Sequence, residues 1–269
     1  MAYSSHATQL CRTRVLFHAL SLSVSLLFTI VARSDDQLTS IARFDKAILL
    51  NDRGNGGDAA FNTGFIVQYH EVLYLVTQYA VADRLSESAL VGISGQNGEN
   101  SWFDLAAIGA TEGGTIRWHH DSDKKISVTQ LSPSDNPTLS ERLRGISIPE
   151  ESLMLNVPQK GTRLEIVGFP VWTELFESRV TPFVLLSGVA SDALLTSPLV
   201  VQKVVIIAPG ANNFVLGAPI FLHRDNPSDC ECAGMYWGTI SPENNSVNFG
   251  IIVPAHEIAK LLKEIAKNE

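Results

Sequence analysis

Histidines beside acidic residues are the first side chains in this sequence that could do chemistry. His119 and His120 come directly before Asp121 and Asp123, and imidazole and carboxylate groups are suitable ligands for zinc or similar ions. Adjacent residues on a strand point to opposite faces, so both histidines do not easily reach one ion. We therefore expect a solvated turn and no metal site. We also interpret His70 as a surface histidine in a hairpin, because no nucleophile motif lies near it.

Two thiols, Cys230 and Cys232, are separated by a single residue. A Cys-x-Cys pair closes only a small, strained disulfide ring. A metal site would need a second pair of ligands, which the sequence does not offer nearby. We favour two free thiols in a polar loop and expect no cofactor. A reactive disulfide, half of a metal site and an intermolecular disulfide are the alternatives.

The elements that must position any site are short apolar runs rich in β-branched and aromatic residues, separated by Gly, Asn, Asp and Pro. Such runs predict strands and turns. The expected strands are 47–50, 64–69, 72–77, 89–93, 102–108, 126–131, 163–168, 183–190, 199–207, 219–222, 235–240 and 248–253. Twelve short strands are typical of an all-β sandwich or of barrels.

A polar stretch over residues 132–160 divides these strands into two sets of six. It contains Pro133, Pro137, Pro149 and Pro158. Because it shows no sustained strand alternation, we interpret it as the connection between a first barrel over about 42–131 and a second over about 161–254.

One helix is expected, over residues 255–266. Pro254 supplies a helix start. The apolar residues Ile258, Leu261, Leu262 and Ile265 then recur at i, i+3, i+4 and i+7, which is the spacing of one helix face.

Residues 1–34 have the pattern of a signal peptide. Arg12 and Arg14 precede an apolar run over 15–32, and Ala32-Arg33-Ser34 follows it. We expect cleavage near Ser34 and a secreted or periplasmic protein. An uncleaved anchor is the less favoured alternative, because the run is at the lower edge of a spanning length.

The expected mature chain is acidic. Without residues 1–34 it holds 17 basic and 28 acidic residues, a formal charge of −11. This balance argues against nucleic acid and against an anionic membrane surface as partners. A hydrophobic content of 45% fits a well-packed globule. Asn244 begins a glycosylation sequon, which has meaning only in a eukaryotic source.

Short motifs lie in a fixed order between residues 62 and 254. They are Asn-Thr-Gly-Phe-Ile-Val at 62–67, Tyr-Leu-Val-Thr at 74–77, Val-Gly-Phe-Pro at 167–170, Ser-Gly-Val-Ala at 187–190, Asn-Phe-Val-Leu-Gly-Ala-Pro-Ile-Phe at 213–221, Gly-Thr-Ile-Ser at 238–241 and Phe-Gly-Ile-Ile-Val-Pro at 249–254. Together they resemble the trypsin-like serine peptidase family, and the last two are similar to its bacterial, HtrA-like branch. The resemblance covers about residues 42–266. It implies two six-stranded antiparallel β-barrels with a C-terminal α-helix.

The resemblance places Ala80, Lys125 and Leu216 at the positions of the catalytic base, acid and nucleophile. Alanine cannot accept a proton, an ammonium opposes an imidazolium, and leucine has no nucleophilic atom. Phe214 stands where the family has a glycine that helps to shape the oxyanion hole. If these three assignments were shifted by one or two residues, the only residue suited to a catalytic role would be Asp123, at the position of the acid. We therefore predict a pseudo-peptidase without catalytic residues.

Function would then depend on surfaces. We expect the former substrate groove to bind a polypeptide partner without cutting it. Its candidate residues are Phe214, Leu216, Gly217, Gly238, Thr239, Ile240 and Ser241. An equally weighted alternative is that Ala80 and Leu216 pack the cleft shut and that binding occurs elsewhere. Two further alternatives are an active secreted serine endopeptidase with displaced catalytic residues, and redox or metal chemistry through Cys230 and Cys232.

Overall fold

The computed structural model describes residues 45–52, 60–86, 88–94, 100–112, 115–123, 125–133, 136–169, 181–191, 195–197, 200–211, 215–225, 229–241 and 248–268. The predicted signal peptide, Phe214 and the sequon at Asn244 lie outside these residues. In the part of the chain that is described, no helix is both long and apolar enough to cross a membrane.

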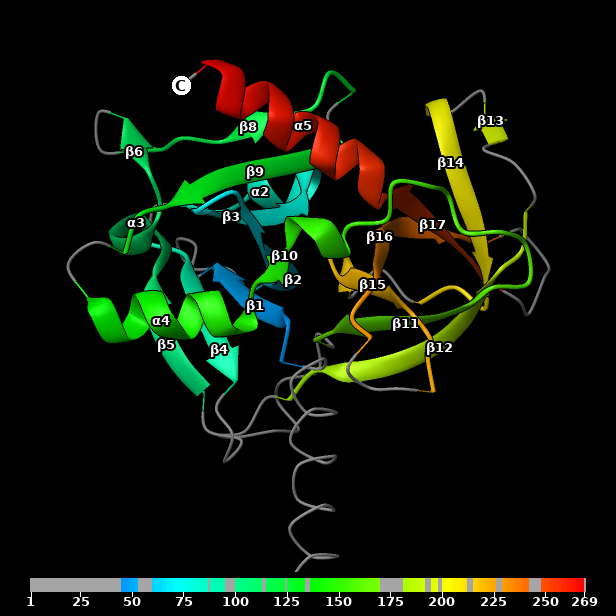
Figure 1. Ribbon diagram of the computed structural model, residues 1–269, viewed down its shortest axis with the longest axis horizontal. Coiled ribbons are helices and arrows are strands. Elements are labelled where there is room, and N and C mark those ends of the chain that lie inside the picture. Colours follow the sequence, from blue (N-terminus) through cyan, green and yellow to red (C-terminus); the bar gives the residue numbers. More distant parts are fainter. Residues whose placement is uncertain are drawn as a thin grey trace, which may run out of the picture. The chain divides into compact units, whose positions relative to one another are not determined.

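The first half of the chain forms one sheet in which six antiparallel strands pair in the order β5-β4-β1-β2-β3-β9 (Figure 1). These are β1 (Ala47–Asp52), β2 (Ala60–Tyr69), β3 (Val72–Gln78), β4 (Leu90–Ser94), β5 (Asn100–Asp104) and β9 (Ile126–Leu131). After β5 the chain returns to β9 through the single-turn helix α3 (Leu105–Ile108). The amide of Ala110 donates to Gln130 O at 2.7 Å there, and Gly109 bridges Leu131.

Short strands extend this first half. The pair β6 (Thr111–Glu112) and β7 (Thr115–Ile116) forms a small hairpin, and β8 (His119–His120) adds to β9. From the connection between the halves, β10 (Ile148–Pro149) pairs in parallel with β2.

The second half forms a closed six-stranded antiparallel barrel. Its strands are β11 (Arg163–Gly168), β12 (Phe183–Val189), β14 (Val200–Ala208), β15 (Pro219–Leu222), β16 (Cys232–Ile240) and β17 (Phe249–Pro254). They pair in the order β12-β11-β15-β16-β17-β14, and a β12–β14 pairing completes the ring. The short β13 (Leu195–Ser197) adds to β14. The predicted all-β fold class is thereby confirmed, with a closed six-stranded barrel in the second half and an antiparallel sheet in the first.

Alternate side chains of the central strands enter two different cores, which explains why these strands read as continuous apolar runs. In β3, Leu73 and Leu75 pack inside the first sheet, whereas Tyr74 and Val76 face the other way. The second face belongs to a core shared with β11, β15, β16 and the last helix. A strand buried on both faces cannot show the polar alternation of a half-exposed one. A third core fills the second barrel.

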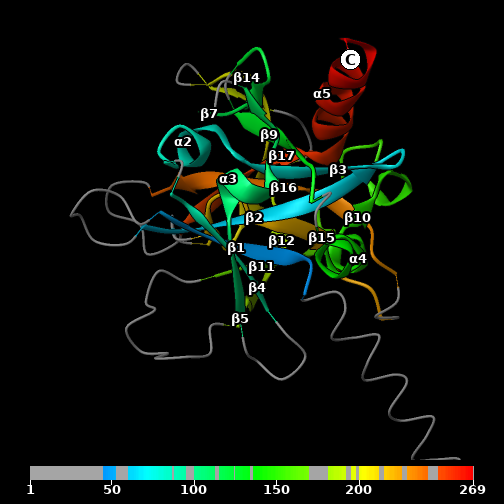
Figure 2. The same cartoon turned by 90° about the vertical axis from the view of Figure 1, so that its left-hand side faces the viewer.

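The predicted C-terminal helix is α5 (Ala255–Asn268), and its four expected apolar residues are all buried in the shared core. Figure 2 shows α5 and the second long helix, α4, on different sides of the sheets. The helix α4 (Pro137–Ile146) lies in the polar stretch that was predicted to connect the two barrels, where no helix was expected. Asn136 caps it by accepting from Leu139 N at 3.0 Å. Leu143 is fully buried in the first core.

A second difference concerns the predicted strand at 102–108, which ends at Asp104 and continues as α3. Leu105 and Ile108 are both buried, and residues i and i+3 share a face only in a helix. The predicted strand is therefore wrong after Asp104, where the apolar residues follow the period of a helix.

Candidate functional site

The three positions predicted for the triad all lie next to the carboxyl end of β3. Ala80 belongs to α2 (Tyr79–Ala82), the single helical turn that continues from β3. Lys125 directly precedes β9, and its carbonyl accepts from Tyr79 N at 3.0 Å. Leu216 lies in the turn before β15, and its carbonyl accepts from Thr63 N at 3.3 Å.

The turn at Leu216 and Gly217 is fixed to the first half by close contacts. Gly217 has φ +83°, and a Cβ there would lie 2.3 Å from Thr63 O and 2.4 Å from Thr77 Oγ1. Only glycine adopts this conformation without strain and also fits the space. Gly217 N donates to Tyr236 O at 2.9 Å, so the turn joins both halves.

Thr63 is the polar centre of this junction. It is fully buried. Its Oγ1 accepts from Phe169 N at 3.0 Å, and its carbonyl accepts from Thr77 Oγ1 at 2.9 Å. With the bond to Leu216, every one of these groups is satisfied, as buried polar groups require. In the sequence Thr63 stands out only as part of a motif, because the residues it contacts are up to 153 positions away.

Leu216 is half-buried and packs against the cores of both halves. Ala80, by contrast, is exposed. The alternative in which both residues pack the predicted cleft shut requires both side chains to be buried. Leu216 is half-buried and Ala80 is exposed, so Ala80 does not meet this requirement.

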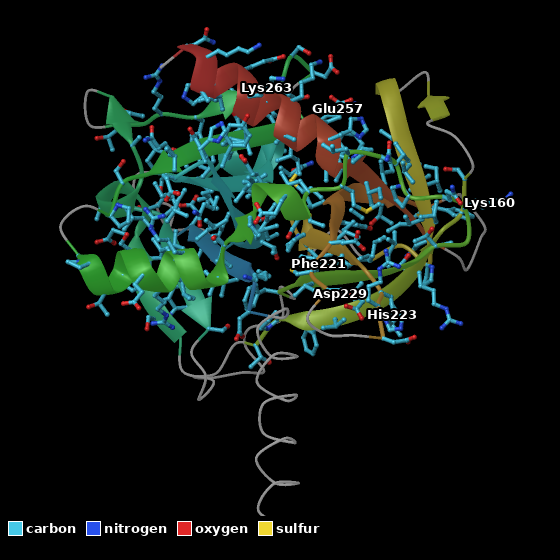
Figure 3. All side chains as sticks on the ribbon, in the orientation of Figure 1. Lys160, Phe221, His223, Asp229, Glu257 and Lys263 are labelled. Carbon is cyan, nitrogen blue, oxygen red and sulfur yellow. The ribbon has the colours of Figure 1, made fainter. Side chains whose placement is uncertain are left out.

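Lys125 carries a buried charge, with 5% of the residue exposed. Burial lowers the pKa of its ammonium, and the carboxylates of Asp123, Asp121 and Glu257 act in the opposite direction. Glu257 projects from α5 (Figure 3). Acids from a turn and from the last helix thus stabilise the charged form of the lysine, and an ammonium at this position would not orient an imidazolium.

The end of β16 forms the opposite border of the predicted groove. Residues 238–240 pair with β17 on one side, whereas the pairing of β16 with β15 stops at Met235. Gly238 has open space at its Cβ position, with no described atom within 4 Å. Ile240 is 42% exposed. A strand edge without a partner in the described part of the chain therefore faces outward here.

Gln78 links this edge to β3. Its Nε2 donates to Trp237 O at 3.1 Å, while its Oε1 is buried with no hydrogen-bond partner among the described residues. A buried acceptor of this kind is normally satisfied by a donor from water or ligand. Gln78 was not among the predicted site residues.

Thr239 and Ser241 are already engaged. The hydroxyl of Thr239 lies 2.5 Å from Ala211 O and 2.7 Å from the hydroxyl of Tyr236, which also binds Ala211 O. Burial raises the pKa of Tyr236 to about 12. Ser241 Oγ donates to Asn248 Oδ1 at 2.9 Å. The side chains of these two candidate residues therefore stabilise the end of β16. The backbone of the strand end is what remains to face outward.

A displaced serine and histidine do contact each other in the first half. His120 Nδ1 lies 2.8 Å from Ser127 Oγ. Ser127, however, is fully buried, and no substrate carbonyl could approach its hydroxyl. His120 also packs edge-on against Tyr79, with ring centroids 5.0 Å apart. The pair therefore has a structural role in this geometry.

The other titratable candidates are engaged in turns. Asp121 Oδ1 accepts from Lys125 N and from Ile126 N, each at 2.6 Å, and so closes the turn before β9. His70 lies in the hairpin between β2 and β3, where its amide donates to Glu150 Oε2 at 3.1 Å. Within the described residues no group of three or more His, Cys, Asp or Glu could hold a metal ion.

Cys230 and Cys232 are both free thiols. Cys232 is fully buried, which raises the pKa of its thiol to about 12. It therefore stays protonated and inert at neutral pH. A contact that the sequence did not suggest joins His223 Nδ1 to the buried Glu165 at 2.7 Å.

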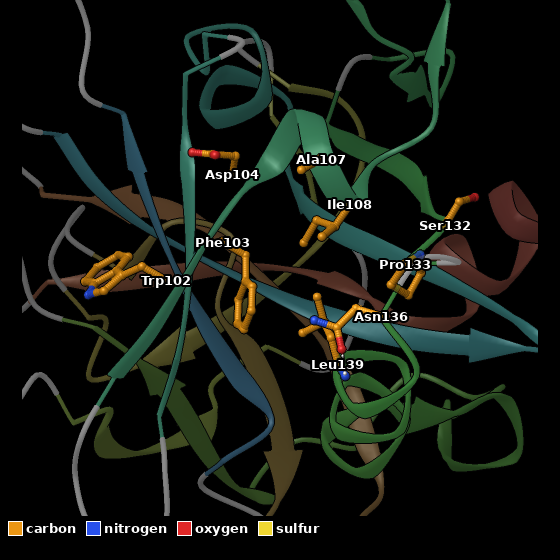
Figure 4. A pocket seen from close by; sticks show the side chains of 9 residues that line it. All are labelled: Trp102, Phe103, Asp104, Ala107, Ile108, Ser132, Pro133, Asn136 and Leu139. Carbon is orange, nitrogen blue, oxygen red and sulfur yellow. Dashed lines mark hydrogen bonds between the residues drawn. The ribbon is translucent and has the colours of Figure 1, made fainter.

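A cavity of about 300 Å³ lies between β5, α3 and the start of α4, and Phe103, Ile108 and Leu139 are among its lining residues (Figure 4). The amide oxygen of Asn136 at its edge already caps α4. None of Ala80, Lys125 and Leu216 lines it, so it is separate from the predicted site.

Comparison with solved structures identifies the fold. The MamO protease domain from Magnetospirillum magneticum has a TM-score of 0.56 at 12% identity and covers 81% of this chain and 96% of that chain. The inactive form of Rv3671c from M. tuberculosis gives 0.55 at 13%, with 86% and 91% covered. The scabies mite inactivated protease paralogue S-I1 gives 0.56 at 9%, with 85% and 97% covered. No protein-family model and no curated protein matches the sequence.

The chain therefore has the fold of trypsin-like serine peptidases, as the sequence motifs implied. Its assignment to the HtrA-like branch stays a prediction.

Proposed function

We propose that this chain is a secreted, catalytically inactive homologue of the trypsin-like peptidases that binds an extended polypeptide in the former catalytic cleft. The observation that carries the proposal is the contrast at the end of β3. The backbone of the turn at Gly217 is held in place by both halves, while Ala, Lys and Leu occupy positions 80, 125 and 216. A triad works as a coupled unit, so three unsuitable side chains leave no route for acyl transfer.

Binding by strand addition is supported by the open edge of β16. Peptides that add to a sheet edge gain affinity from main-chain hydrogen bonds. Residues 238–240 present such an edge, Gly238 leaves room beside it, and the buried acceptor of Gln78 lies nearby. The name of the scabies mite neighbour describes an inactivated protease, which is a precedent for the fold without catalysis.

Secretion or periplasmic location is part of this proposal and is supported by the signal-like pattern of residues 1–34. The acidic charge of the remaining chain favours a polypeptide partner over nucleic acid or an anionic membrane. The active-peptidase alternative has one candidate pair, His120 and Ser127, and the burial of Ser127 argues against it.

A pair of matched substitutions tests the binding site. Random peptides of about twelve residues, long enough to fill an extended groove, would be selected on the full chain. Their affinities would then be measured for the wild type, Ala80→Arg and Ala107→Arg. Both alanines are exposed and lie in single-turn helices, α2 and α3.

The proposal expects Ala80→Arg to weaken binding at least about tenfold, because the new side chain would fill the cleft, and Ala107→Arg to leave it unchanged. Mass spectrometry after prolonged incubation should find the peptides intact. Equal affinities for all three proteins, or cleaved peptides, would contradict it.

A further inference from the structure

A second groove, of about 530 Å³, lies at the other end of β3 from Ala80. It is bordered by the end of β2, the 3-10 turn η1 (Glu150–Ser152) and α5. Its apolar residues are Tyr69, Leu155 and Ala259. Leu155 is 76% exposed, so an aliphatic side chain stands in water beside a hollow large enough for several side chains.

The two walls of this groove carry opposite charges. Glu150 and Glu151 line it from η1, and Lys260 and Lys263 line it from α5. The two lysines are three positions apart and so share one face of the helix. Figure 3 shows Lys263 projecting from α5.

These charges do not neutralise one another. Glu150 is engaged by His70, whose amide donates to Oε2 and whose Nδ1 lies 3.6 Å from Oε1. Across the described part of the molecule, no ion pair joins η1 to Lys260 or Lys263. Glu151, Lys260 and Lys263 are exposed. A ligand could therefore pair with both walls without breaking an existing ion pair.

We propose that this groove binds a segment of a partner polypeptide in which one apolar side chain lies between an acidic and a basic side chain. The apolar group packs on Leu155, Tyr69 and Ala259. The acidic group pairs with Lys260 and Lys263, and the basic group pairs with Glu151. The site is separate from the former cleft and does not depend on peptide binding there.

Charge complementarity selects this occupant over others. A nucleic acid or an anionic membrane surface presents one sign of charge and would be repelled by one wall. Complementary charges at a rim fix the direction of a bound segment, and a central apolar anchor supplies most of its affinity.

The test uses two blocked synthetic peptides of opposite order, acetyl-Glu-Glu-Ala-Leu-Ala-Lys-Lys-amide and acetyl-Lys-Lys-Ala-Leu-Ala-Glu-Glu-amide, titrated into the full chain. The wild type is expected to prefer one order by at least about threefold, which is the scale of exposed ion pairs. The charge-exchanged variant E151K/K260E/K263E is expected to prefer the other order. All three positions are exposed, so the fold should persist, and circular dichroism checks it.

Leu155→Asn should weaken the preferred peptide about tenfold, because it removes the apolar contact. Leu186→Asn is the matched control, since Leu186 is 63% exposed on β12 and does not line the groove. The inference is overturned if neither peptide binds, if the order preference does not reverse, or if Leu186→Asn weakens binding as much as Leu155→Asn. Self-association of the chain that depends on the same residues would also overturn it, because the occupant would then be a second copy.

Discussion

Two glycines on opposite borders of the former cleft differ sharply in their surroundings. Gly217 is enclosed by Thr63 and Thr77, with no room for a Cβ, whereas Gly238 has open space beside it. The first belongs to a turn that both halves hold in place, and the second belongs to a strand edge that faces outward. The comparison teaches that the two borders differ in what they tolerate: the turn at Gly217 has no room for a side chain, whereas the strand edge at Gly238 has.

The largest expected effect is the loss of stability caused by a methyl group at Gly217, which the same change at Gly238 should not cause. Gly217→Ala should destabilise the fold by about 3 kcal/mol or more, because the methyl group would overlap Thr63 O and the backbone has a positive φ. Gly238→Ala should change stability by less than about 0.5 kcal/mol. Urea unfolding measures both. Similar values for the two variants would remove the contrast between the enclosed turn and the open edge.

Leu216→Ser would place a hydroxyl at the predicted nucleophile position. We expect a loss of about 1–2 kcal/mol, because Leu216 is half-buried against two cores, and no gain of peptidase activity, because Ala80 provides no base. Leu155→Ser, at a residue that is 76% exposed, serves as the control and should be nearly neutral. Peptide hydrolysis by Leu216→Ser above the wild-type background would show that another residue acts as the base and would contradict this expectation.

Gln78→Ala tests the link between the end of β3 and the open edge of β16. The substitution removes the donor to Trp237 O across the two halves, and we expect a loss of about 1 kcal/mol. Gln68→Ala is the matched control, since its amide makes only a 3.4 Å contact with His70 O in an exposed hairpin. Equal thermal stability of the two variants would mean that the link contributes nothing.

The smallest effect concerns the charge of Lys125. Burial lowers its pKa in the folded chain below that in the unfolded chain, so the cost of burying the charge is fully present at neutral pH. As pH rises through the lowered value toward 10.5, the unfolded state binds more protons than the folded state, and the cost disappears. Lys125→Met should therefore be more stable than the wild type near neutral pH, and the difference should shrink as pH rises. A stability difference between the two proteins that grows with pH would contradict this expectation, because it would mean that the charge of Lys125 stabilises the fold.

Much of the fold follows from the sequence because local signals agree with the tertiary structure. Apolar runs of strand length correspond to β1 and β3. The i, i+3, i+4, i+7 pattern that ends at Ile265 corresponds to α5. The helix α4 was missed because Asn136-Pro137 is a turn signal as well as a capped helix start. Its apolar face is only two buried leucines wide, too weak a pattern to decide between the two.

The site is less accessible to sequence reasoning. The identities of residues 80, 125 and 216 can be read directly, but the roles of Thr63 and Gln78 depend on partners more than a hundred positions away. The groove at η1 and α5 likewise joins residues that no local pattern connects. Long-range contacts of this kind leave no periodic trace in a single sequence.

The most direct test of the central claim is labelling of the native, full-length protein with a fluorophosphonate, which reacts covalently with activated serines. The account predicts no labelling above that of the heat-unfolded protein, because the predicted nucleophile position is Leu216 and Ser127 is buried. Stoichiometric labelling of any serine in the folded protein would contradict the account.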